Sequence, residues 1–111
     1  MTSRRILVLL AVLAASSSAG ATIFGSVRGI IHDPQHRPIQ GAMVMLRAKS
    51  SDWAKTTNSD SNGQFEFNAV PIGEYSVSVA SPGFVQTAQD IVVASGTEPV
   101  VHFQLQVAGK N

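Results

Sequence analysis

The sequence predicts an all-β fold, a seven-stranded antiparallel β-sandwich, and one stretch of the chain carries most of that prediction. Between Thr56 and Phe84, polar and apolar residues alternate in two runs, Gln64–Phe67 and Glu74–Val79. Turn-forming residues bound these runs at Asp60–Gly63, Val70–Gly73 and Pro82–Phe84. Alternation with a period of two between such turns is typical of antiparallel strands that bury one face. We therefore expect the first two turns to be hairpins, with Gly63 at positive φ.

The N-terminal segment has the pattern of a secretory signal peptide. Arg4 and Arg5 precede an unbroken apolar run over residues 6–15, and Ala19-Gly20-Ala21 fits a small-x-small cleavage site. The apolar run is shorter than the roughly 20 residues that a membrane span needs. We expect residues 1–21 to be cleaved, which leaves a domain over residues 22–111. An uncleaved anchor and, because of the paired arginines, a twin-arginine signal remain alternatives to the general secretory route.

Composition narrows the class of protein further. The whole chain has eight basic and seven acidic residues. Without Arg4 and Arg5 the mature chain would have six basic residues and a formal charge of −1, so there is no basic patch for nucleic acid. With no cysteine in an exported chain, neither a disulfide nor a lipid anchor on cysteine is available. We expect a hydrophobic core to hold the fold alone, and no transmembrane segment in the mature chain.

The remaining strands follow from the same two signals. We expect strands over residues 23–32, 41–48, 55–58, 85–93 and 99–107. Glycine and serine in the first of these indicate a bulge or a close backbone approach. The side chains expected to point into the core are Val27, Ile31, Ala42, Val44, Leu46, Ala48, Phe65, Phe67, Tyr75, Val77, Val79, Val101, Phe103, Leu105 and Val107.

The order of these features resembles the carboxypeptidase regulatory-like domain. The resemblance rests on turn and core positions in sequence: Asp33, Pro38, Gly41-Ala42-x-Val44-x-Leu46, Asp60-x-x-Gly63-x-Phe65-x-Phe67, Val70-Pro71-x-Gly73-x-Tyr75-x-Val77-x-Val79 and Pro82-Gly83-Phe84. It implies a prealbumin-like, transthyretin-like sandwich of the group that includes starch-binding folds. Members of the family occur alone, beside metallocarboxypeptidase domains and at the N-terminus of TonB-dependent receptors. Every matching position is structural, so the resemblance implies no activity.

No residue set in the chain points to catalysis, a metal or a cofactor. His32 and His36 flank Asp33 at a spacing that could chelate a metal, but no third ligand is evident beside them or His102. Asn58, Asp60 and Asn62 mimic the first half of a calcium loop, yet Ala69 stands where the bidentate glutamate belongs. No nucleophile elbow or Ser-His-Asp arrangement is present. We therefore predict a protein that is not an enzyme.

Two places remain as candidate contacts for a ligand or partner. Met43 and Met45 lie on the strand face opposite Val44 and Leu46, which makes that outer face partly apolar. Trp53 is an amphipathic ring on a polar loop and could stack on a sugar or fold over Met43 and Met45. Phe84 could join it as a second sugar-stacking ring, but the family resemblance favours packing of Phe84 on the edge of the sandwich.

The sequence thus predicts an exported, non-catalytic accessory or interaction module of the bacterial envelope. It would reside in the periplasm, at the outer-membrane surface or outside the cell, and its partner would be a protein. One alternative is a carbohydrate-binding module. A second alternative is the N-terminal domain of a TonB-dependent receptor separated from its plug and barrel.

Overall fold

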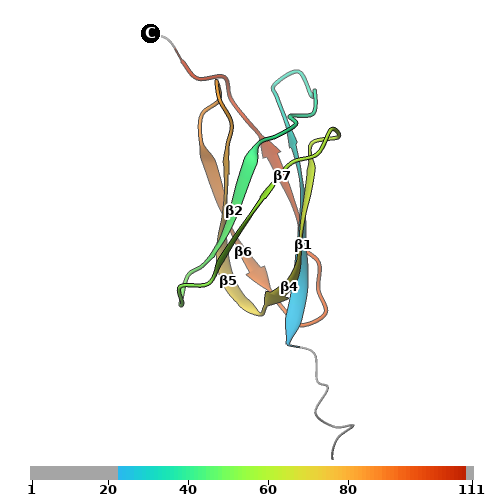
Figure 1. Ribbon diagram of the computed structural model, residues 1–111, viewed down its shortest axis with the longest axis vertical. Coiled ribbons are helices and arrows are strands. Elements are labelled where there is room, and N and C mark those ends of the chain that lie inside the picture. The colour runs from blue at the N-terminus through green and yellow to red at the C-terminus, as the bar shows by residue number, and fades with distance from the viewer. Residues whose placement is uncertain (1–22, 110–111) are drawn as a thin grey trace, which may run out of the picture.

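The computed structural model describes residues 23–109, which form two β-sheets packed face to face (Figure 1). The strands are β1 (Phe24–His32), β2 (Met43–Ala48), β3 (Ala54–Asn58), β4 (Gln64–Pro71), β5 (Gly73–Ala80), β6 (Thr87–Val93) and β7 (Val100–Gln104). One sheet has the order β4-β1-β7 and the other β3-β2-β5-β6. The predicted all-β sandwich is confirmed, whereas the predicted signal peptide lies outside the described residues.

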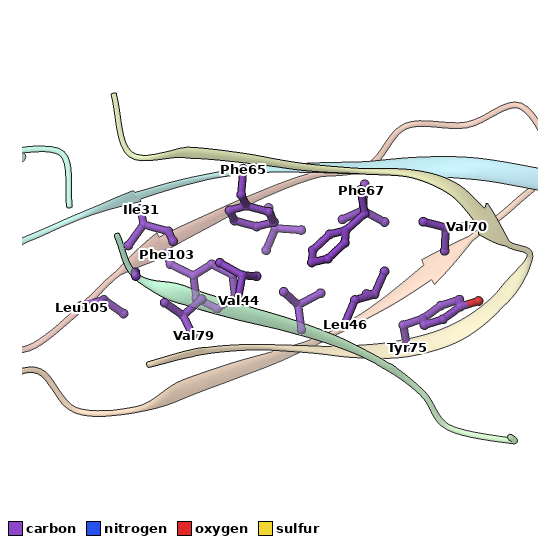
Figure 2. Packing of buried hydrophobic residues seen from close by; sticks show 14 of the residues in the cluster. Ile31, Val44, Leu46, Phe65, Phe67, Val70, Tyr75, Val79, Phe103 and Leu105 are labelled. Carbon is purple, nitrogen blue, oxygen red and sulfur yellow. The ribbon is translucent and has the colours of Figure 1, made fainter. Parts of the chain in front are cut away.

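The core lies between the two sheets and follows the predicted alternation. Phe65 and Phe67 from β4 point toward Val44 and Leu46 from β2, and Tyr75 closes one end (Figure 2). Of the fifteen side chains predicted to point inward, thirteen are buried; Ala48 is only half-buried. Strands of this pattern form here because each buries one apolar face against the opposite sheet.

Val107 is the exception to the predicted core, since it is 64% exposed. Strand β7 ends at Gln104, and the chain then pairs with the loop between β5 and β6. The Val85 amide donates to the Gln106 carbonyl at 2.8 Å, and the Ala108 amide to the Gly83 carbonyl at 2.9 Å. Because the chain has left the sheet at this point, the alternation that buries Val101, Phe103 and Leu105 no longer directs residue 107 inward.

The two predicted hairpins are wrong, although both turns are present. The turn Asp60–Gly63 leads from β3 to β4, and Ile72 alone separates β4 from β5. In each case the two strands belong to different sheets, so they face each other across the core and do not pair. Each strand needs to cover its apolar face, and the opposite sheet provides that cover. The true antiparallel neighbours in sequence are β2 with β3 and β5 with β6.

The expectation of a wholly antiparallel fold also needs one correction, because β1 and β7 pair in parallel from Arg28 opposite Val100 to His32 opposite Gln104. The other strand pairs are antiparallel. Each connection reverses the direction of the chain, so odd-numbered strands all run the same way. When β7 joins the sheet beside β1, the two are necessarily parallel.

The bulge lies in β4 and not in the first strand, where a bulge or a close backbone approach was expected; the close approach is present in β1, at Gly25 and Gly29. The pairing of β1 with β4 shifts by one residue between Gly25 and Val27, and Ala69 on the β4 side has a φ of 54°. A bulge increases local twist and bends the strand that carries it. Here it bends β4 just before the chain crosses at Ile72 to the other sheet.

Candidate functional site

Met43 and Met45 lie on the outer surface of the four-stranded sheet, as predicted. Met43 is 49% exposed, and Met45 is half-buried beside it on β2. The neighbouring positions on β5 carry small side chains: Ala80 lies opposite Met43 and Ser78 opposite Met45. The result is a shallow groove, called the methionine face below, lined by Met43, Met45, Arg47, Ser76, Ser78, Ala80 and Gln86.

The charges on the methionine face are confined to one end. The Arg47 guanidinium lies 3.4 Å from the Met45 sulfur, and within residues 23–109 no carboxylate forms an ion pair with it. Farther along, Lys49 Nζ contacts an Asp90 carboxylate oxygen at 2.8 Å. Toward Met43 and Ala80 the surface is uncharged. A patch of this kind suits contact with another protein, because thioether chains adapt to irregular partner surfaces.

The small residues of β5 were not recognised from the sequence as part of a site. Ser76, Ser78 and Ala80 alternate with the buried Tyr75, Val77 and Val79. The alternation placed them outside the core, but only the pairing of β2 with β5 brings them beside the methionines. Strand neighbours that are distant in sequence are not encoded in local periodicity.

Trp53 does not cover the methionines, contrary to one of the two predicted placements. It packs against the core, and its ring meets the Tyr75 ring edge-to-face with centroids 5.5 Å apart. Side chains alternate between faces along a strand, so Trp53 lies on the face of its sheet opposite Met45, whose partner on β3 is Thr56. The ring is half-buried rather than free on a loop.

Trp53 and Phe84 cannot form one sugar-stacking platform. Trp53 precedes β3 at the end of the sheet where Ala48 pairs with Tyr75, whereas Phe84 follows β5 beyond the pair Met43–Ala80. The two loops therefore lie at opposite ends of the sandwich (Figure 1). Phe84 is itself partly buried against the core. The two-ring arrangement considered from the sequence is wrong.

The turn after β1 is organised around Asp33, a buried carboxylate. Its oxygens accept hydrogen bonds from the Gln35 amide, the Arg37 amide and Arg37 Nε, at 2.9, 2.9 and 2.8 Å. Burial by itself raises the pKa of Asp33, but the Arg37 amide, the Arg37 guanidinium and the Gln35 amide outweigh it and hold the pKa below its usual value. Asp33 therefore serves the turn, and its carboxylate is not free for a metal.

The two histidines of that turn do come together. Their ring centroids lie 5.0 Å apart, and His32 Nδ1 lies 3.1 Å from the Asp33 carbonyl oxygen. His36 has a φ of 65°. In the part of the chain that the structure describes, no group of three or more His, Asp or Glu residues is arranged to hold a metal ion.

The half calcium loop is a turn, as predicted. Asp60 Oδ1 accepts the amides of Asn62 and Gln64, each at 2.9 Å, and Gly63 has the expected positive φ of 74°. A Cβ at Gly63 would overlap the carbonyl oxygen of Ile31. The Ile31 amide also donates a hydrogen bond to the Gly63 carbonyl, at 2.7 Å. Glycine is therefore required where this turn approaches β1.

Buried Ser59 is a structural residue that the sequence analysis missed. Its hydroxyl donates to the Ile39 carbonyl at 2.6 Å and accepts the Ala42 amide at 2.9 Å. These bonds tie the entry of β2 to the exit of β3. Nothing in the local pattern distinguishes Ser59 from the other serines of the chain.

Residues 23–109 contain no helix that is long and apolar enough to cross a lipid bilayer.

A sequence profile of the carboxypeptidase regulatory-like domain matches residues 26–106, from within β1 to beyond β7. This chain belongs to that family. The match confirms the resemblance drawn from the turn and core positions.

The similarity of this carboxypeptidase regulatory-like domain to named proteins covers part of the chain. The serine-aspartate repeat-containing protein F of Staphylococcus epidermidis is 36% identical over 61 residues, which is 54% of this chain and 4% of that protein. Among solved structures, the Streptococcal ancillary pilin superposes with a TM-score of 0.65 at 17% identity, covering 79% of this chain and 34% of the pilin.

A third similar structure comes from an enzyme. Catechol 1,2-dioxygenase from Pseudomonas arvilla C-1 superposes with a TM-score of 0.65 at 11% identity, covering 82% of this chain and 55% of that one. At such identities the two structural likenesses show a shared sandwich fold and nothing about activity.

Proposed function

We propose that this protein is an exported, non-catalytic interaction module of the bacterial envelope, which contacts a protein partner through the methionine face. The observation that carries the proposal is the exposure of Met43 beside the small side chains of Ala80 and Ser78, which makes an uncharged and partly apolar surface. Apolar groups that gather at one place on a protein surface often mark a site of contact with another molecule.

Membership of a regulatory-like domain family and similarity to a serine-aspartate repeat-containing protein support a role without catalysis. The likeness to a pilin supports export, with the periplasm, the outer-membrane surface and the exterior as the compartments to test. The family name includes the word carboxypeptidase, but the proposal assigns no peptidase activity to this chain.

Capture of envelope proteins by the immobilised mature domain tests the proposal. Wild-type protein should retain a specific partner, and the double variant Met43→Asp with Met45→Asp should lose it, because two carboxylates would have to be desolvated at the contact. Val100→Asp is the matched control, since Val100 is an exposed apolar residue on the outer surface of the other sheet. A double variant that captures the partner as well as wild type contradicts the proposed surface.

The absence of catalysis has its own assay. Purified mature domain should hydrolyse no peptide substrate, with or without added zinc. Turnover that scales with protein concentration and is lost in His32→Ala or His36→Ala would overturn the non-catalytic assignment.

The carbohydrate-binding alternative has no specific observation in its favour, because Trp53 and Phe84 are separated and both rings pack against the core. The receptor-fragment alternative stays a prediction, which the adjoining coding sequence would test.

A further inference from the structure

The four edges of the sandwich differ in how they are protected against pairing with another strand. Natural edge strands are blunted by short length, lysine, proline or a bulge. Strand β3 has five residues, includes Lys55 and contributes no fully buried side chain. Strand β4 has the bulge at Ala69 and ends at Pro71. Strand β7 also has five residues, and the chain leaves the sheet after Gln104.

Strand β6 lacks all four of these features, and its one charged residue is Asp90. Its seven residues, Thr87–Val93, include no lysine, arginine, proline or glycine. It pairs with β5 in unbroken register from Gly73 opposite Val93 to Val79 opposite Thr87. Val92 is 67% exposed on it. In the described part of the chain no strand lies on its other side.

The one link from β6 to the neighbouring edge uses a side chain. Gln89 Nε2 donates to the His102 carbonyl of β7 at 2.8 Å. Among the hydrogen bonds of residues 23–109, none beyond the ladder with β5 engages the backbone of Thr87–Val93. An edge with unpaired backbone donors and acceptors is a template for one kind of occupant, an extended chain.

Charge specifies that occupant further. Asp90 and Val92 share the outer surface with Ser76 and Glu74, their partners on β5. The same outer surface carries two cations, Lys49, which is paired with Asp90, and Arg47, which is the register partner of Ser76, so they balance Asp90 and Glu74. Within β6 itself Asp90 is the one charged residue, so a strand added beside β6 gains from a basic side chain opposite Asp90.

The same charge argues against a second copy of this chain as the occupant. Antiparallel pairing of β6 with its own copy over all seven residues would place Asp90 directly opposite Asp90. Like charges directly opposite each other destabilise a strand pair.

From the unprotected edge and its charge we infer that β6 accepts an added antiparallel strand from a partner protein, an extended segment with a basic residue opposite Asp90. This inference rests on the proposed interaction function and extends it, because the added strand would enlarge the same sheet that carries the methionine face. Gln86, which lines that face, immediately precedes β6.

Three synthetic peptides test the inference. The first is a capped nine-residue peptide of alternating valine and threonine with lysine at the central outward position; the second has glutamate in place of the lysine. The third is the lysine peptide with proline at two alternate positions, which removes backbone donors. Binding is followed by amide chemical shifts of isotopically labelled mature protein.

The lysine peptide should shift amides of residues 87–93, bind at least about two-fold more tightly than the glutamate peptide, and lose binding with proline. In Asp90→Lys the preference between lysine and glutamate should reverse. Asp52→Lys, in the exposed loop before β3, makes the same charge change away from β6 and should leave the preference unchanged. Thermal unfolding midpoints equal to wild type establish that both variants are folded.

The inference is overturned if no β6 amide shifts at about 1 mM peptide, or if the proline peptide binds as well as its parent. It is also overturned if β6 amides shift with protein concentration alone, because the occupant would then be a second copy. Retention of the envelope partner by the Met43→Asp, Met45→Asp variant is a separate result, which bears on the proposed function and not on the peptides.

Discussion

The Phe65 ring lies directly against the backbone of Gly29, at a position where any side chain on Gly29 would overlap the ring. Both residues face the core, Gly29 from β1 and Phe65 from the neighbouring strand β4, and they are register partners. Glycine at position 29 thus supplies the space that a phenylalanine occupies. The weak β propensity of a glycine in mid-strand is offset by the burial of that ring.

Gly29→Ala should therefore destabilise the domain by about 1–3 kcal/mol through overpacking. Combining it with Phe65→Leu should cost less than the sum of the two single changes, because the smaller side chain vacates the overlap. Gly109→Ala is the control, since a Cβ at Gly109 would meet nothing within 4 Å. Urea unfolding of the four proteins measures the coupling, and simple additivity would contradict the contact.

Phe67→Ala should cost about 3–5 kcal/mol, a large part of the roughly 5–15 kcal/mol that holds a domain together. Phe67 is buried between the sheets and meets Phe65 edge-to-face, with centroids 5.9 Å apart (Figure 2). Gln64→Ala, on the exposed side of the same strand, should change little. Equal midpoints of chemical denaturation for Phe67→Ala and wild type would show that the assigned register of β4 is wrong.

Asp33→Asn should lower stability at neutral pH and have a diminishing effect in acid. The hydrogen bonds from Arg37 and Gln35 lower the pKa of Asp33 in the folded state, so its ionised form contributes stability above the unfolded pKa of about 3.9. That contribution is lost as pH falls through the folded-state pKa. Unfolding midpoints of wild type and variant should converge below about pH 4. Asp52→Asn, on an exposed loop, should show no such convergence.

Trp53→Ala should reduce stability, because the edge-to-face contact with Tyr75 is worth about 0.5–1.5 kcal/mol beyond the area that the ring buries. The same geometry predicts that α-glucans leave Trp53 fluorescence unchanged. Tyr75→Phe, which keeps the ring and removes only the hydroxyl that donates to the Pro71 carbonyl, is the matched variant for the ring contact. A saturable fluorescence change with glucan would restore the carbohydrate-binding alternative.

Export should yield a mature protein that begins at Thr22. The positive start, the short apolar run and Ala19-Gly20-Ala21 direct cleavage after Ala21. Intact mass spectrometry of the exported protein measures this directly. A mature species that retains Met1 would contradict the predicted signal peptide.

Local alternation was sufficient to place the strands and most of the core. Phe65, Phe67, Val77 and Val79 are buried where their spacing put them. The outer positions of β2, Met43 and Met45, were also found, because a strand face is defined by every second residue. The turn at Gly63 followed from residue chemistry alone, since positive φ favours glycine.

Only the tertiary structure decided which strands pair. The turns at Asp60–Gly63 and Ile72 have hairpin chemistry, yet both carry the chain to the opposite sheet. A turn fixes the reversal of the chain within a few residues, whereas the partner of each strand depends on contacts between segments far apart in sequence. The parallel pairing of β1 with β7, the position of Trp53 against Tyr75 and the unpaired edge of β6 all follow from those distant contacts. Periodicity in the sequence therefore determined which side chains are buried, and the packing of the two sheets determined what each of them meets.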